Sequence, residues 1–213
     1  MQIQDVILQL LLKQPFYGYV ASLVTPCESS SIPDILLDAA SSPKLLYNRE
    51  WFEGLSGQQA MGAVMHELLH LVLMHPFRRG NREKLLWAVA CDMAVNEYIS
   101  PSMLPGNAVT TGKIAREYRE KIPPLESAEA YYEILLENNG NVSFIDRKSE
   151  VQLVLKSGLE LKAKPCSEDD SAEVNRNALK SMISEVLQQA EAEGEVPDGL
   201  QKHIVEVYSS AQM

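Results

Sequence analysis

Long apolar runs are missing from this sequence of 213 residues. None approaches the roughly 20 residues that a membrane-spanning helix needs, so we expect no transmembrane segment. The first residues, MQIQDVILQLLLKQPF, also lack the basic start and the small-residue cleavage site of a secretory signal. These absences predict a cytoplasmic protein that does not act at a membrane.

Cysteine and positive charge are scarce as well. The three cysteines, Cys27, Cys91 and Cys166, are an odd number without paired spacing, which predicts reduced thiols rather than disulfides. Nineteen lysines and arginines face 29 aspartates and glutamates, for a net charge of −10. An acidic surface repels phosphate, so the charge disfavours nucleic acid and anionic lipid as partners.

The remaining composition is that of a globular protein. Hydrophobic residues make up 46% of the chain and charged residues 23%. A chain of this length can bury a sizeable core without disulfides or structural metals. We see no internal repeat. The sequence therefore predicts one domain over 1–213.

Local patterns favour a helix-rich α+β fold with a small sheet built from the first third of the chain. The stretch 140–170 is the hardest to assign, and VQLVLKSGLELKAK within it predicts a hairpin or loop insertion that turns at 156–158. A capping box at 170–173 predicts the start of a helix that Gly194 stops. The predicted helices cover 2–13, 56–74, 82–99, 113–121, 127–137, 170–193 and 198–209, and the predicted strands cover 16–26, 34–38 and 44–47.

The segment MGAVMHELLHLVLMH carries the chemistry. His66 and His70 are four residues apart, so on a helix both imidazoles project from one face, as two ligands of one zinc ion would. Glu67 completes an H-E-x-x-H pattern, in which the glutamate acts as general base beside the metal. The chain's own composition predicts about 0.007 chance matches to this pattern. The spacing therefore indicates a zinc site with Glu67 as the catalytic residue.

The surroundings of the motif strengthen this interpretation. The helix around His66 and His70 is apolar on nearly every side, which predicts that it is buried. Burying two histidines and a glutamate costs several kcal/mol unless they gain partners, and a bound metal offsets that cost.

A catalytic zinc takes a third protein ligand and keeps one position for water. Asp92 is the first candidate, because it lies in the middle of the apolar helical segment KLLWAVACDMAVNEYI, where a carboxylate needs a charged partner or a metal. Asn96 follows one turn later on the same face and could orient that carboxylate.

Two other residues compete with Asp92. Glu97 belongs to an Asn-Glu pair similar to the third-ligand motif of thermolysin-type enzymes. His75 lies nine residues after His66 and could return to the site only if the helix ends, as Pro76 allows.

At these residues the chain resembles a bacterial and phage family of metallopeptidase-like proteins, in which a zincin-like domain usually precedes a von Willebrand factor A-like domain. The resemblance rests on KLLYNREWF, HELLHLVLMHPFRRGNREKLLWAVACDMAVNEYI, SAEAYYEILLE and EGEVPDGLQKHIVEV. It implies a zincin-like fold with the sheet packed on the H-E-x-x-H helix.

The resemblance also implies roles for particular residues. His66, His70 and Asp92 would bind zinc, and Glu67 would be the catalytic acid and base. KLLYN would be the edge strand to which an extended peptide adds. Because the chain stops at Met213, we expect the von Willebrand-like domain to be absent, and an AAA+ ATPase of the MoxR type is implied as a partner.

Two functions remain open at this point. The first is a zinc-dependent metallopeptidase that hydrolyses peptide bonds of a peptide or protein substrate with zinc-activated water and Glu67 as general base. The alternative is a non-catalytic zinc-bound scaffold or adaptor that works with the AAA+ ATPase. Three protein ligands favour the enzyme, whereas a fourth ligand in His75 favours the scaffold.

Overall fold

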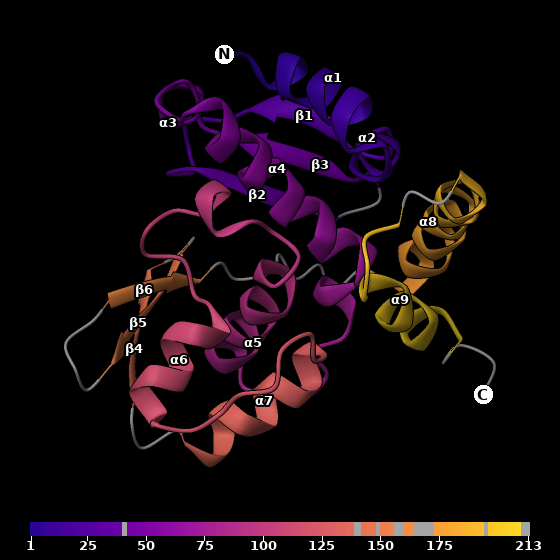
Figure 1. Cartoon of the computed structure of the whole chain (residues 1–213). Coiled ribbons are helices and arrows are strands. Elements are labelled where there is room, and N and C mark those ends of the chain that lie inside the picture. The colour runs from indigo at the N-terminus through magenta and orange to yellow at the C-terminus, as the bar shows by residue number, and fades with distance from the viewer. Residues whose placement is uncertain are drawn as a thin grey trace. The chain divides into compact units, whose positions relative to one another are not determined.

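The computed structural model describes residues 1–39, 42–138, 142–147, 150–155, 160–163, 173–193 and 196–209. Its residues divide into two compact units, the first made of Met1–Arg78 and Ser167–Met213 and the second of Arg79–Cys166. Both units combine helices with short strands (Figure 1), which confirms the helix-rich α+β class. Division by contacts does not test whether the chain folds as one domain, so the single domain over 1–213 stays a prediction.

The first unit contains a small mixed sheet of three strands, β1 (Thr25–Glu28), β2 (Ile35–Asp38) and β3 (Lys44–Tyr47). The strand order is β1-β3-β2, with β1 parallel and β2 antiparallel to β3. The strands predicted at 34–38 and 44–47 are therefore confirmed. The expectation that KLLYN is an edge strand is wrong, because β1 and β2 pair with β3 from opposite sides.

Helices cover this sheet. The H-E-x-x-H helix, α4 (Gly57–Val72), packs against β2, and α1 (Ile3–Lys13) packs against both α2 (Pro15–Ala21) and α4. Ser56 caps α4: its hydroxyl accepts from the Gln59 N–H, and the Gln59 side chain accepts from the Ser56 N–H. The helices of this unit are α1 (Ile3–Lys13), α2 (Pro15–Ala21), α3 (Arg49–Glu53), α4 (Gly57–Val72), α8 (Glu173–Glu193) and α9 (Leu200–Ser209).

The strand predicted over 16–26 is wrong over most of its length. Pro15 opens α2 at its first turn, where a missing N–H costs nothing, and the helix runs to Ala21 before β1 begins at Thr25. The aromatic and β-branched content of the segment suggested a strand. Its buried residues follow helical spacing instead: Phe16, Tyr17, Val20 and Ala21.

The second unit is built around the buried helix α5 (Lys84–Asn96). This helix packs against α7 (Ala128–Glu137) and against β5 (Glu150–Leu155) and β6 (Glu160–Ala163). The two strands pair antiparallel, which confirms the predicted hairpin, while its turn at 156–158 lies outside the described residues. The unit also contains α6 (Thr111–Tyr118) and β4 (Val142–Arg147), a strand that the sequence patterns did not predict.

Two further predictions concern the long helix near the C-terminus and membrane-spanning helices. Glu173–Glu193 confirms the long helix, but Asp170 and Gly194, its predicted start and stop, lie outside the described residues. Across the described ranges, every helix is too short or too polar to pass through a bilayer.

Candidate metal centre

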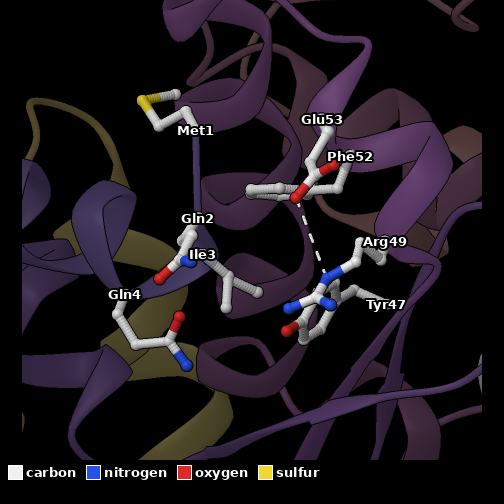
Figure 2. A pocket seen from close by; sticks show the side chains of 8 residues that line it. All are labelled: Met1, Gln2, Ile3, Gln4, Tyr47, Arg49, Phe52 and Glu53. Atoms are coloured by element: carbon white, nitrogen blue, oxygen red, sulfur yellow. Dashed lines mark ion pairs between the residues drawn. The ribbon is translucent and has the colours of Figure 1, made fainter.

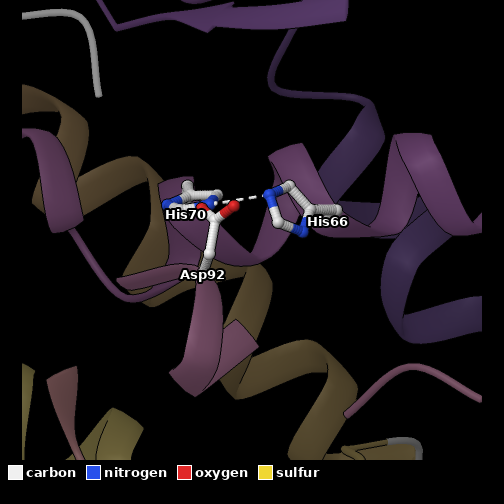
Figure 3. A group of neighbouring side chains, drawn as sticks. All are labelled: His66, His70 and Asp92. Carbon is white, nitrogen blue, oxygen red and sulfur yellow. Dashed lines mark hydrogen bonds between the residues drawn. The ribbon is translucent and has the colours of Figure 1, made fainter. Parts of the chain in front are cut away.

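Two histidines of α4 turn their outer ring nitrogens toward each other. His66 Nε2 and His70 Nε2 lie 3.0 Å apart (Figure 3). Their spacing of four residues puts both rings on one face of the helix, as predicted. Both residues are buried, with 8% and 4% of their surface exposed. The pair therefore presents two nitrogen ligands to a single point.

Asp92 of α5 joins this pair. His66, His70 and Asp92 each offer one ligand atom, and the three atoms lie within 4.8 Å of one another (Figure 3). Among the residues that the structure describes, this is the one group of three or more such side chains that could bind a metal ion. Asp92 is 3% exposed and lies in a helix that is buried from Leu86 to Asn96.

Glu67 is held by the backbone of the neighbouring strand. The N–H of Leu37 in β2 donates to Glu67 Oε2 at 2.8 Å, and Glu67 is 2% exposed. A backbone amide at this distance fixes the orientation of the carboxylate. Sequence reasoning missed this contact, because a backbone donor 30 residues away leaves no side-chain signal.

His75 returns toward the motif after α4 ends. The helix stops at Val72, and His75 Nδ1 lies 3.1 Å from His70 Nδ1. Burial, followed by the neighbouring His70 and Arg78, holds the pKa of His75 well below its usual value of 6.5. His75 is thus a neutral imidazole near neutral pH, and it faces the inner nitrogen of His70 rather than Nε2.

Glu97 and Asn96, which the sequence also suggested for the site, form hydrogen bonds with other residues. Glu97 caps the end of α5 and accepts a hydrogen bond from the Thr111 hydroxyl. Asn96 donates through Nδ2 to the carbonyl of Val109 at 2.7 Å, which ties α5 to the segment before α6. A role for Asn96 in orienting Asp92 stays a prediction.

A small pocket lies among the first residues of α1 and the segment around α3 (Figure 2). Arg49 stands at its wall and pairs with Glu53 at 3.8 Å and with Glu28 at 3.3 Å. The volume of the pocket, about 130 Å³, is below that of sites for drug-sized ligands. Neither Glu67 nor any of the three candidate ligands lines this pocket. Its lining residues are Met1, Gln2, Ile3, Gln4, Tyr47, Arg49, Phe52 and Glu53.

Comparison with known proteins identifies the family of this chain. The chain belongs to the family described as "Putative metallopeptidase domain", which matches residues 2–211. Membership in a metallopeptidase family implies a metal cofactor, and His66, His70 and Asp92 are residues that could bind it.

One similar protein is an "Uncharacterized protein" of Thermotoga maritima, with 28% identity over 141 residues. The match covers 59% of this chain and 35% of that protein, so the chain corresponds to about a third of its relative's length. No solved structure matches the chain.

Proposed function

We propose that this chain is the zinc-binding domain of a metallopeptidase that hydrolyses peptide bonds. His66, His70 and Asp92 would bind the metal, and Glu67 would act as general base and acid. The observation that carries the proposal is the convergence of these three ligand atoms within 4.8 Å, with Glu67 directly after His66 in the sequence.

The donor set fits zinc. Two imidazole nitrogens and a carboxylate oxygen form a common protein ligand set of catalytic zinc, which keeps a further position for water. Two zinc–nitrogen bonds of about 2.0–2.1 Å at the tetrahedral angle separate their nitrogens by about 3.3 Å. The 3.0 Å between His66 Nε2 and His70 Nε2 is close to that value.

Burial supports a bound cation as well. Glu67, Asp92, His66 and His70 are all at most 8% exposed. Two carboxylates placed so deep in a protein are costly unless positive charge lies nearby. A divalent ion would supply that charge.

The chemistry then divides between the metal and the chain. A bound zinc supplies Lewis-acid chemistry, polarising the scissile carbonyl and making water more acidic. Glu67 takes the proton from the attacking water and passes it to the nitrogen of the leaving amine. The Leu37 N–H keeps Oε2 of that carboxylate in place during both transfers.

Replacing Glu67 by glutamine tests the proposal. The amide keeps the size of the side chain but cannot take a proton, so peptide hydrolysis should fall by about 10²–10⁴ while zinc content stays at about one ion per chain. Casein and a peptide library would serve as substrates, with zinc measured on the same samples.

Glu53→Gln is the matched control, because the Glu53 side chain is 52% exposed and belongs to α3. This variant should hydrolyse at the parent's rate. Hydrolysis by Glu67→Gln at the parent's rate would contradict the assignment of Glu67 as general base.

A further inference from the structure

The two ring nitrogens of His70 face two different histidines. Nε2 lies 3.0 Å from His66 Nε2, on the side where the candidate metal ligands meet. Nδ1 lies 3.1 Å from His75 Nδ1, at the opposite edge of the ring. We infer that His75 is a positioning residue, which fixes the tautomer and the orientation of His70 so that Nε2 is presented to the metal.

This inference rests on the proposed role of His70 as a ligand. That role determines which ring nitrogens of His70 and His75 carry hydrogen. A histidine that binds metal through Nε2 carries its hydrogen at Nδ1. His70 Nδ1–H is then the donor, and His75 Nδ1 is the acceptor. His75 therefore carries its own hydrogen at Nε2.

The backbone after α4 is shaped to bring His75 back. Met74 adopts the left-handed conformation with φ of 53°, which is costly for a residue with a side chain, and His75 then opens a short 3₁₀ turn with Pro76. The ring of His75 ends up 1% exposed. A helix that simply continued past Val72 would carry His75 away from His70.

Two side chains hold the helix end from which this turn starts. Arg78 Nη1 donates to the Leu73 carbonyl at 2.7 Å, and the Tyr208 hydroxyl of α9 donates to the Val72 carbonyl at 3.0 Å. Both bonds satisfy carbonyls that the end of a helix leaves without intrahelical donors. The position of His75 is thus fixed by contacts from its own turn and from the last helix.

The same geometry bears on the alternative of a structural zinc with four protein ligands. A fourth ligand would have to point at the metal beside His70 Nε2. His75 instead approaches the inner nitrogen of the ring. Its place supports a site with three protein ligands, which a hydrolase requires.

Zinc affinity in two variants of the full chain tests the inference. His75→Leu removes the acceptor, and zinc affinity measured by competition with a chelator should fall about 10–100-fold. His75→Asn places an amide oxygen near the former Nδ1, so its affinity should lie closer to the parent's. Equal losses in both variants, or no loss in the leucine variant, would overturn the inference.

A second readout does not need metal. Nitrogen-15 NMR of the histidine rings in the zinc-free chain should show His70 protonated at Nδ1 in the parent and in His75→Asn, and a tautomer mixture in His75→Leu. A parent His70 protonated at Nε2 would overturn the inference, even if the leucine variant did not fold. A parent that binds no zinc would overturn the proposed function instead, whatever tautomer the NMR shows.

Discussion

Two carboxylates, Asp92 within α5 and Glu97 at its C-terminal end, competed for the third ligand position, and their surroundings in the structure differ. Asp92 lies in the buried stretch of the helix, and its carboxylate belongs to the group with His66 and His70. Glu97 caps the helix and accepts from Thr111. A carboxylate already used by a hydroxyl at a helix end is the weaker candidate for a metal ligand.

Alanine variants of these two residues should separate their roles. Asp92→Ala removes one of the three proposed ligand atoms, so the zinc content of the purified chain should fall from about one ion to a trace. Glu97→Ala, at the end of the same helix, should keep the parent's zinc content. Elemental analysis measures both, with His66→Ala as the reference for a lost ligand. A Glu97→Ala chain without zinc, beside an Asp92→Ala chain that keeps it, would reverse the assignment.

The residues of the site differed in how far sequence could predict them. The pairing of His66 with His70 follows from helical geometry alone. Asp92 could be predicted because a carboxylate inside an apolar helix is costly to bury without a metal or a charged partner. The contacts of His75 and Leu37 could not be predicted. The first depends on a left-handed turn at Met74, a residue type that rarely adopts one, and the second comes from a backbone amide.

At the scale of elements, the boundaries of the central helices were easier to predict than the choice between helix and strand for the segment around Gly18. The central helices were predicted at 56–74 and 82–99 and are found at Gly57–Val72 and Lys84–Asn96. Their capping residues and long apolar stretches are strong local signals. The segment 16–26 was misassigned because β-branched and aromatic residues also fill buried helices, and only packing between α1 and α2 decides between the two.

That packing predicts the effect of one substitution. A Cβ added at Gly18 in α2 would lie 2.4 Å from Leu11 Cα and 2.8 Å from Leu11 N in α1. Alanine is the better helix former by about 1 kcal/mol, but the clash is with backbone and forces the two helices apart. Gly18→Ala should therefore lower the free energy of unfolding by about 1–3 kcal/mol, measured by urea denaturation.

Gly57→Ala is the matched control in the same unit. Its Cβ would meet only the end of the Met1 side chain, at an ordinary 3.7 Å. This variant should be unchanged or stabilised by up to about 1 kcal/mol. A Gly18→Ala chain as stable as the control would show that α1 and α2 can separate at no cost.

At the scale of the whole molecule, the sequence alone predicted the fold class, which the structure confirms, and a metallopeptidase family, which the match over residues 2–211 shows. The division into two compact units was not predicted. Local patterns mark helices and strands but do not report which of them pack together over long sequence separations. The peptide substrate and the AAA+ ATPase partner stay predictions.

Each unit contains one tryptophan and a tyrosine whose pKa is raised by burial. Trp51 belongs to the first unit with Tyr208, and Trp87 belongs to the second with Tyr131. Burial raises the pKa of Tyr208 far above its usual value of 10, with Arg78 opposing the shift. Burial also raises the pKa of Tyr131 to about 12. The Tyr131 hydroxyl donates to the Pro123 carbonyl and accepts from the Glu126 N–H.

These tyrosines predict how the chain responds to alkali. The unfolded chain releases the Tyr131 proton from about pH 10, whereas the folded chain holds it to about pH 12. The stability contributed by the protonated tyrosine is therefore complete below pH 10 and is lost as pH rises from 10 toward 12. Tyr131→Phe should be less stable than the parent at pH 8, since it loses two hydrogen bonds, but its stability should decline less steeply above pH 10.

Urea unfolding at a series of pH values, followed by Trp87 fluorescence in a Trp51→Phe background, measures this decline for the second unit. Between pH 8 and pH 10 Tyr131 is protonated in both folded and unfolded chains, so the parent and Tyr131→Phe should run parallel there. Above pH 10 the two curves should converge. Curves that remained parallel up to pH 12 would mean that Tyr131 ionises in the folded chain as readily as in the unfolded one, and that the second unit admits water to its hydroxyl.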